Sequence, residues 1–403
     1  MNLFTNFYKY SLTIFLSLSI LVLPGCGDDD EPSAPAIVKL EESTALFSRS
    51  KSEMENLANA ANLPELAALL NYDVKIYTIT YKTDYLGKEI IASGLVTFPE
   101  TDEAMPMMSF QHGTMAKNSE APTKDIQTYS FLSSVASNGY IFLIPDFIGF
   151  GSSADILHPY YRSELTASSI TDMMIAAKEL ATIEGYKFNG DAFLIGYSEG
   201  GYATMAAHKS IEENGLTGFN LVASAPSSGG YDVKGMQEYF FDQEVYDQPF
   251  YMAYVALAYK DTYNWDQPLS DYFQEPYATD IPSYFDGSLS GGDINAKLTT
   301  VVGDFLTADF LAGIDTDPKY KPLVDAFEEN SLDNWVPTVK MYMYHGTADV
   351  TVPYQNSVNT YDRMIQAGAS TDVVKFIPLE GQTHGSGFFP YLYDVLNTFS
   401  SLK

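Results

Sequence analysis

A serine flanked by glycines is the first feature that could take part in catalysis. Ser198 lies in the segment DAFLIGYSEGGYATMAAH (191–208), with Gly196 two residues before it and Gly200 two residues after it. Apolar residues lead into the motif and small residues follow it, so it falls where a buried strand turns directly into a helix. Such a tight turn leaves no room for Cβ atoms and pushes the serine oxygen toward a substrate carbonyl. The pattern predicts a nucleophilic serine at position 198.

A serine hydroxyl is a poor nucleophile until a base takes its proton, and histidine can accept and return a proton at neutral pH. The triad of this class of sheet follows the chain order serine, acid, histidine, so only His345 and His384 qualify. His345 ends a predicted strand, ahead of any acid in its loop. His384 follows the last predicted strand, in the glycine-rich segment LEGQTHGSG. We therefore predict His384 as the base, with His345 as the alternative.

The acid that orients the histidine should lie on the loop after the penultimate strand, between the serine and the histidine. Asp349, in the segment HGTADVTVP, occupies that place. Its alternative role is that of a loop aspartate capping the helix that begins near Pro353. Three other aspartates compete less well because each belongs to a helix or its boundary: Asp333, Asp362 and Asp372.

The oxyanion of an acyl-transfer reaction needs two backbone N–H groups directed at it. One should belong to the residue after the nucleophile, Glu199. The other should come from the loop that follows the strand-like segment PMMSFQHGTM, where Thr114 is the first choice and Gly113 the second. Glu199 matters here through its amide, and its side chain could equally be that of a surface helix residue.

The elements that must position these residues alternate between strand and helix patterns. Residues 72–83 and 88–98 are β-branched and alternating, and a turn at Gly87 joins them as a hairpin. Before them, residues 50–71 predict two short helices broken near Pro64. After them, helical stretches separate six strand-like runs: 106–111, 139–145, 191–196, 219–225, 339–346 and 373–379. This order predicts an α/β fold with a mainly parallel sheet, helices on both faces, and sites at the carboxyl ends of the strands.

One interval, about residues 227–336, breaks this alternation and is rich in aromatic residues. Because an unstructured loop of that length would be abnormal in a compact domain, we predict a helical cap inserted after the sixth core strand. Most of its aromatic side chains should pack against one another. As a group over a cleft, some of them should line an apolar pocket.

The N-terminus has the layout of a bacterial secretory signal. Residues 1–25 contain Lys9 and the apolar run SLTIFLSLSILVL, which is too short for the roughly 20 residues of a membrane-spanning helix. The segment LPGC resembles a lipoprotein lipobox, which implies that the single cysteine, Cys26, is acylated. Residues 26–45 then form an acidic flexible tether, whose acidic cluster resembles a signal for surface display. The alternatives are an uncleaved anchor and an incidental cysteine.

Composition limits the partners. The 403 residues, 46% apolar and 14% aromatic, can bury a substantial core. The net charge of −30, from 52 acidic and 22 basic residues, argues against binding to nucleic acid or to an anionic membrane surface. Contact with a membrane is therefore expected only through the N-terminal lipid anchor. That anchor places the protein on the bacterial outer membrane, facing the periplasm or the cell surface.

Taken together, these motifs resemble the α/β-hydrolase superfamily over residues 72–400. The resemblance rests on Ser198, Asp349, His384, the His112–Gly113 loop and the segment PDFIGFGSS (145–153). Within the superfamily, the segments QHGT, HPYY and SAPSSGGYD and the long insertion are similar to the secretory lipase group and its bacterial relatives. The resemblance implies a hydrolase domain over residues 46–403 that cleaves small-molecule or lipid carboxylic esters through an acyl-enzyme, without cofactor or metal.

Other functions remain compatible with this reading, because a fold does not determine function. A serine peptidase or aminopeptidase uses the same triad. An esterase that removes acetyl or feruloyl groups from polysaccharides suits a surface lipoprotein with an aromatic cap. A binding protein without catalytic activity is a fourth possibility.

Overall fold

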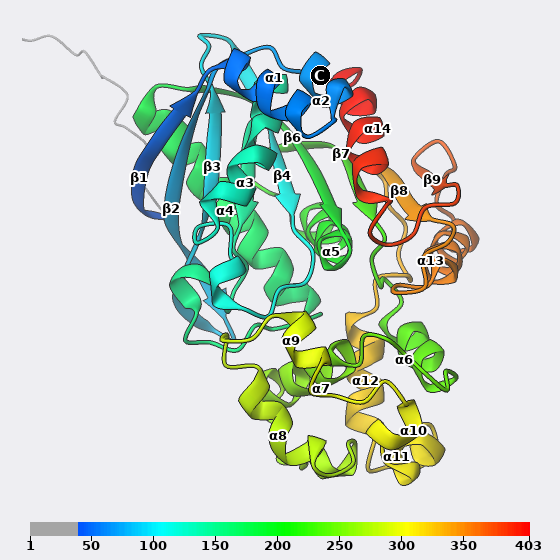
Figure 1. The fold of residues 1–403 in the computed structure, drawn as a ribbon. Coiled ribbons are helices and arrows are strands. Elements are labelled where there is room, and N and C mark those ends of the chain that lie inside the picture. Colours follow the sequence, from blue (N-terminus) through cyan, green and yellow to red (C-terminus); the bar gives the residue numbers. More distant parts are fainter. Residues whose placement is uncertain (1–38) are drawn as a thin grey trace, which may run out of the picture. The chain divides into compact units, whose positions relative to one another are not determined.

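A nine-stranded mixed sheet organises residues 39–403, which are the residues that the computed structural model describes (Figure 1). The order across the sheet is β1-β2-β3-β5-β4-β6-β7-β8-β9. The strands are β1 (Leu40–Arg49), β2 (Val74–Tyr85), β3 (Lys88–Pro99), β4 (Ala104–Gln111), β5 (Ile141–Pro145), β6 (Lys187–Tyr197), β7 (Asn220–Ser227), β8 (Lys340–Gly346) and β9 (Val374–Leu379). The predicted signal segment and Cys26 lie outside the described residues.

The strand order creates a switch point at β4. The pairs β1–β2, β2–β3 and β3–β5 are antiparallel, whereas β5, β4, β6, β7, β8 and β9 pair parallel in that sequence. The chain goes from β4 to β5 on one side and then to β6 on the other side of β4. The loops leaving the carboxyl ends of β4 and β6 diverge at this point, which is where open α/β sheets hold their ligands. The predicted mainly parallel sheet is confirmed.

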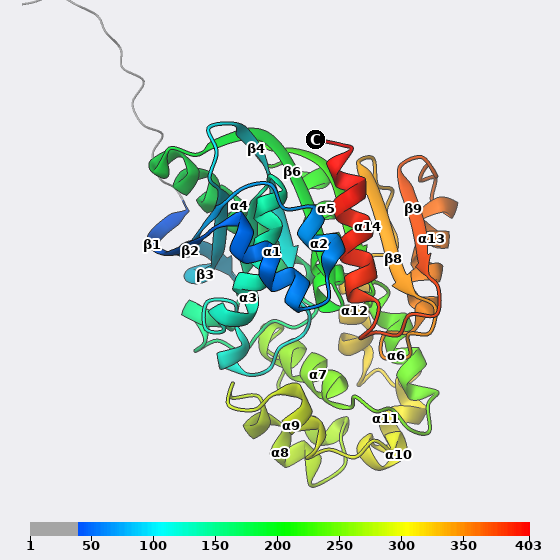
Figure 2. The same ribbon diagram turned by 45° about the horizontal axis from the view of Figure 1, so that its top comes forward.

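Helices cover both faces of the sheet (Figures 1 and 2). One face packs against α1 (Lys51–Ala60), α2 (Pro64–Ala68), α3 (Ile126–Leu132) and α14 (Phe388–Ser400). The other face packs against α4 (Ser163–Glu184), α5 (Glu199–Asn214) and α13 (Tyr354–Gln366). In β6, Phe193 and Ile195 join the first core, and Ala192 and Leu194 join the second. Because successive strand residues face opposite sides, a strand covered on both sides is apolar throughout.

A helical cap joins β7 to β8 and lies at the carboxyl ends of the parallel strands (Figure 1, bottom). Its helices are α6 (Val233–Phe241), α7 (Phe250–Thr262), α8 (Tyr277–Tyr284), α9 (Gly291–Asn295), α10 (Val302–Phe305), α11 (Ala308–Gly313) and α12 (Lys321–Asn330). The structure therefore places helices in the interval where the sequence predicts a cap. Among the described residues, no helix is both long and apolar enough to span a membrane.

The N-terminal edge of the sheet differs from the prediction. The acidic tether is expected to reach residue 45, but Leu40–Arg49 form β1, which pairs with β2 along its length. Only Leu40 of this strand is buried, so LEESTALFSR lacks the alternation that marks a half-buried strand.

The expected hairpin is confirmed, with Leu86 and Gly87 in the left-handed region between β2 and β3. The break between α1 and α2 before Pro64 is confirmed as well.

Candidate active site

Ser198 occupies a strained turn between β6 and α5. Its φ of 61° and ψ of −125° are unfavourable for a residue with a side chain, and such strain is typical of functional sites. A Cβ atom at Gly196 would overlap the carbonyl group of Gly200, and one at Gly200 would overlap the carbonyl group of Gln111. The spacing of the glycines is therefore imposed by the close approach of α5 to β4 and β6.

The structure brings Ser198, His384 and Asp349 into one chain of hydrogen bonds. His384 Nε2 lies 2.8 Å from Ser198 Oγ, and His384 Nδ1 lies 2.6 Å from Asp349 Oδ2. Because a carboxylate only accepts, Nδ1 carries the proton, and the lone pair of Nε2 faces the serine hydroxyl. His384 comes from the loop between β9 and α14 and is partly exposed, whereas the Asp349 side chain is fully buried. This arrangement is competent to move a proton from serine to histidine.

Asp349 is held as a carboxylate by four donors. The amides of Thr351 and Val352 donate to Oδ1 at 3.0 and 3.1 Å, while His384 and His345 contact Oδ2. Burial alone would raise the pKa of Asp349. The hydrogen bonds from His345 and His384 outweigh burial, so the pKa falls to about 2. The site thus keeps a negative charge beside His384 across the neutral range.

His345, the alternative base, is completely buried on the other side of Asp349. Its Nδ1 lies 2.6 Å from Ser357 Oγ, and its Nε2 lies 2.9 Å from the carbonyl oxygen of Val352 and 3.2 Å from Asp349 Oδ2. Because the Val352 carbonyl oxygen only accepts, Nε2 is protonated and donates to Asp349 as well. His345 therefore supports the acid and makes no contact with Ser198.

The competing aspartates lie elsewhere. Asp333 pairs with Arg363, Asp362 belongs to α13, and Asp372 precedes β9. Among the hydrogen bonds of the described residues, none of these three carboxylates contacts His384.

The backbone predicted to bind an oxyanion lies beside the serine. A Cβ atom placed on Gly113 would sit 3.5 Å from Ser198 Cβ, so this loop packs directly against the elbow. Thr114 borders the same cleft as Ser198 and His384, and its hydroxyl lies 3.0 Å from that of Tyr160. Within residues 39–403, the amides of Thr114 and Glu199 donate to no protein acceptor. Glu199 is the first residue of α5, where such N–H groups are expected to be free.

The Glu199 side chain is not on the surface, which corrects the alternative considered from the sequence. It is 3% exposed, and its Oε1 lies 2.7 Å from Nε2 of His158, itself 4% exposed. Nδ1 of His158 lies 2.6 Å from the carbonyl oxygen of Ile148 and therefore donates to it. One proton is consequently shared between Nε2 and the carboxyl group. His158 belongs to the HPYY segment, and no pattern in the sequence indicated its contact with Glu199.

Tyr197, the residue between Gly196 and Ser198, fixes the histidine loop. Its hydroxyl donates to the main-chain oxygen of His384 at 2.7 Å, and the two rings lie 5.5 Å apart. This contact has no sequence signal, because it joins two residues 187 positions apart.

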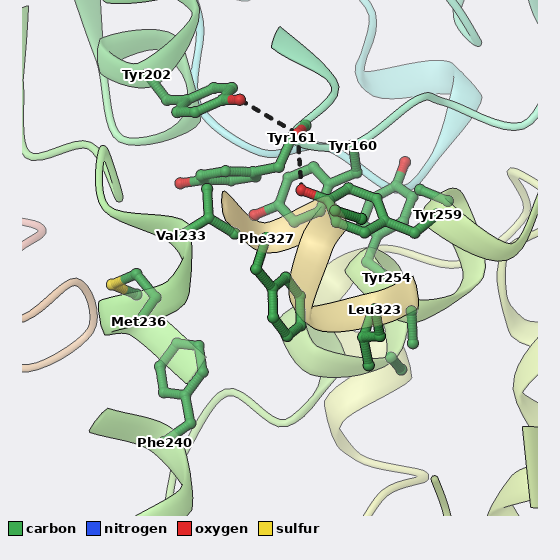
Figure 3. Close-up of a cluster of buried hydrophobic side chains, with 14 of the residues drawn as sticks. Tyr160, Tyr161, Tyr202, Val233, Met236, Phe240, Tyr254, Tyr259, Leu323 and Phe327 are labelled. Atoms are coloured by element: carbon green, nitrogen blue, oxygen red, sulfur yellow. Dashed lines mark hydrogen bonds between the residues drawn. The ribbon is translucent and has the colours of Figure 1, made fainter. Parts of the chain in front are cut away.

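Ser198 opens onto two spaces. The first, which we call the cap pocket, lies beneath the cap, and its empty volume together with the solvent at its mouth is about 800 Å³. Figure 3 shows part of its wall, made by side chains from α6 and α12 and by Tyr160. Its lining contains no Asp, Glu, Lys or Arg side chain. The second, the open cleft, also borders His384 and Thr114 and is more polar. The expectation that some cap aromatics line an apolar pocket is met by Phe240, Phe241 and Tyr251.

The cap is tied to the core through two carbonyl groups. Tyr259 of α7 donates its hydroxyl group to the main-chain oxygen of Tyr161 at 3.0 Å, and the hydroxyl group of Tyr202 of α5 lies 2.7 Å from the main-chain oxygen of Asn330 in α12 and 3.2 Å from that of Tyr161 (Figure 3). Tyr161 has a φ of 57°, an uncommon conformation that directs its carbonyl group between the two hydroxyl groups. Beside it, the Arg162 guanidinium stacks 3.7 Å from the ring centre of Tyr263.

Residues 39–403 contain no cluster of three or more His, Cys, Asp or Glu side chains placed to hold an ion.

Comparison with known proteins identifies the architecture. No family model and no curated protein matches the chain. Among solved structures, a candidate hydrolase from Legionella pneumophila is similar with a TM-score of 0.82 and 26% identity, covering 91% of this chain and 98% of that one. A ligand-bound form of the rice cell wall degrading esterase LipA from Xanthomonas oryzae is similar with a TM-score of 0.78 and 24% identity, covering 90% of this chain and 97% of that one. Lipase A from Candida antarctica in its closed state is similar with a TM-score of 0.65 and 14% identity, covering 91% of this chain and 83% of that one.

Proposed function

We propose that this chain, which has the α/β-hydrolase fold and resembles the lipases and esterases of that superfamily, is a serine hydrolase that cleaves carboxylic esters. The hydrolase class is supported by its structural neighbours. The chemistry is carried by one observation, the hydrogen-bonded chain of Ser198, His384 and Asp349 at the mouth of an apolar pocket.

The first half-reaction forms an acyl-enzyme. Ser198 Oγ attacks the ester carbonyl carbon while His384 Nε2 takes its proton, and Asp349 stabilises the resulting imidazolium. The amides of Glu199 and of Thr114, or alternatively Gly113, hold the developing oxyanion. The carbon–oxygen bond to the alcohol then breaks, and the alcohol oxygen takes the proton from Nε2.

The second half-reaction releases the acid. Water attacks the acyl carbon while His384 Nε2 takes one of its protons, and the same amides hold the oxyanion. The bond between the acyl carbon and Ser198 Oγ then breaks, and Ser198 Oγ takes the proton back from His384 Nε2. No step requires a metal or an organic cofactor.

The cap pocket suits the acyl group. It borders Ser198, to which the acyl carbon is bonded, and it is lined by aromatic and aliphatic side chains. Burying each methylene group there contributes about 0.8 kcal/mol. An apolar acyl chain is therefore favoured over a charged peptide terminus, for which the pocket has no partner.

The test uses purified protein with p-nitrophenyl esters from acetate to palmitate, together with Ser198→Ala. We expect turnover that Ser198→Ala abolishes, and covalent labelling of Ser198 by a fluorophosphonate, seen by mass spectrometry. Equal turnover by Ser198→Ala would refute the proposal, and hydrolysis of dipeptide amides instead of esters would favour the peptidase alternative.

A second candidate is removal of acetyl or feruloyl groups from polysaccharides. It is favoured by the similarity to a cell wall degrading esterase and by the open cleft, which combines aromatic rings with polar groups at Tyr129, Tyr251, Gln248 and Ser290. Release of acetate from acetylated xylan, or of ferulate from a feruloyl sugar, would support it. Activity on simple esters alone would argue against it.

We also propose that residues 1–25 are a lipoprotein signal and that acylated Cys26 anchors the enzyme to the bacterial outer membrane, on its periplasmic or surface side. The support is the sequence pattern alone. Palmitate labelling of cells producing the full chain should mark the protein, and Cys26→Ser should remove the label. Protease treatment of intact cells distinguishes the two sides, because only a surface protein is digested.

A further inference from the structure

A third hollow lies beside the open cleft, between α3 and α14. We call it the α3–α14 groove; it is walled by Phe131 and Leu132 of α3 and by Phe388, Phe389 and Leu392 of α14. Its empty volume together with the solvent above it is about 820 Å³, and no Asp, Glu, Lys or Arg side chain borders it. Phe389 is 39% exposed at its rim, which is unusual for a large apolar side chain.

The α3–α14 groove adjoins the open cleft. Five residues border both spaces: Gly113, Thr128, Tyr129, Tyr197 and Phe388. Gly113 packs against Ser198, and the Tyr197 hydroxyl holds the main chain of His384. The groove therefore lies next to the reacting site, between α3 and α14.

Proton transfer decides which half of an ester reaches the groove. The alcohol oxygen must receive its proton from His384 Nε2 when its bond to the acyl carbon breaks, so the alcohol lies on the His384 side. His384 borders the open cleft and not the cap pocket. Phe388, four residues after His384, lines both the open cleft and the groove. The acyl group then extends beneath the cap, and the alcohol extends over His384 toward α14.

We propose that the α3–α14 groove is the alcohol subsite and that it accepts an apolar alcohol, such as a long alkyl chain. This inference rests on the proposed ester hydrolysis and adds to it the chemical class of the leaving group. Burial of about 0.8 kcal/mol per methylene corresponds to a rise in kcat/KM of up to about fourfold for each methylene that enters the groove.

The experiment keeps the acyl group constant and varies the alcohol. Initial rates of acetate release are measured for ethyl, butyl, hexyl and octyl acetate, each below its solubility limit. Two variants of α3 are compared with the wild type: Thr128→Trp, whose side chain would fill the junction of groove and cleft, and Gln127→Trp as the matched control. Both positions are exposed, but Gln127 borders neither space.

We expect the ratio of kcat/KM for octyl acetate to that for ethyl acetate to exceed about tenfold in the wild type and in Gln127→Trp. Thr128→Trp should lower this ratio at least about tenfold, and Phe389→Ser should lower it less. A second series, from methyl acetate to methyl octanoate, should give the same chain-length profile in both α3 variants, because the acyl group uses the cap pocket.

A ratio near one in the wild type, or equal ratios in Thr128→Trp and Gln127→Trp, would overturn the alcohol subsite while leaving ester hydrolysis intact. Preference for sugar acetates over octyl acetate would do the same. Absence of turnover on every ester would overturn the proposed function and this inference with it.

Discussion

Replacing Glu199 tests how much the buried contact with His158 stabilises the elbow. In Glu199→Ala, Nε2 of His158 loses its partner while remaining 96% buried, since the imidazole is only 4% exposed. Removing one member of such a buried pair costs about 3–5 kcal/mol. In Glu199→Gln, the amide group keeps the volume and donates to Nε2, so only the charge-assisted part of the bond is lost, about 1 kcal/mol.

The comparison between the two variants isolates the hydrogen bond. Oε2 of Glu199 is buried without a protein partner among the described residues, and Glu199→Gln leaves its amide oxygen in the same position. The two variants should therefore differ by at least about 2 kcal/mol, which corresponds to about 0.7 M in the urea midpoint if the slope is about 3 kcal/mol/M.

The assay is urea unfolding at neutral pH, followed by circular dichroism and by tryptophan fluorescence, with coincident transitions as the condition for comparing midpoints. Glu213→Ala is the matched control, because Glu213 lies on the same helix and makes an exposed ion pair with Lys209. Its free energy of unfolding should stay within about 0.5 kcal/mol of that of the wild type. Equal midpoints for Glu199→Ala and Glu199→Gln would refute the reasoning.

Three further changes bear on the reacting groups. Asp349→Asn should lower kcat on a p-nitrophenyl ester by about 10³- to 10⁴-fold with folding retained by circular dichroism, because asparagine does not hold His384 in the required tautomer. The pKa of Asp349, lowered from 3.8 to about 2, gives stability that is fully present above about pH 4 and is lost as pH falls toward 2. The unfolding free energies of wild type and Asp349→Asn should therefore approach one another by about 2 kcal/mol between pH 5 and pH 2, and a constant gap would contradict this. Tyr197→Phe removes the bond to the His384 carbonyl group and should cost about 1 kcal/mol of stability and about fivefold in kcat, measured by urea unfolding and steady-state kinetics.

The sequence indicated the fold and the position of Ser198 because both follow from strong local constraints. The strand-to-helix turn requires glycines at fixed spacing, and buried parallel strands require continuous apolar runs. The positions of Asp349 and His384 followed from chain order along the sheet. In the structure these residues meet, and the loops that carry them occupy the carboxyl edge where the pattern placed them.

Other parts of the site have no local signature. Glu199 and His158 are 41 positions apart and meet only because the loop after β5 folds against the start of α5. The strand β1 is an exposed edge with one buried residue, so hydrophobic alternation does not mark it. The α3–α14 groove combines a helix near residue 130 with one near residue 390. Contacts of this kind depend on tertiary packing, which periodicity does not encode.

The two carbonyl groups that tie the cap to the core have a consequence for how substrate arrives. Raising the cap from the elbow helix would break two buried hydrogen bonds, from Tyr259 of α7 to the main-chain oxygen of Tyr161 and from Tyr202 of α5 to that of Asn330 in α12. We therefore expect the cap to stay in place and an ester substrate to enter through the open cleft. An enzyme built this way has no need of an oil–water surface to open it. Its initial rate should rise hyperbolically with ester concentration. No abrupt increase in rate should occur at the concentration where the ester begins to form micelles.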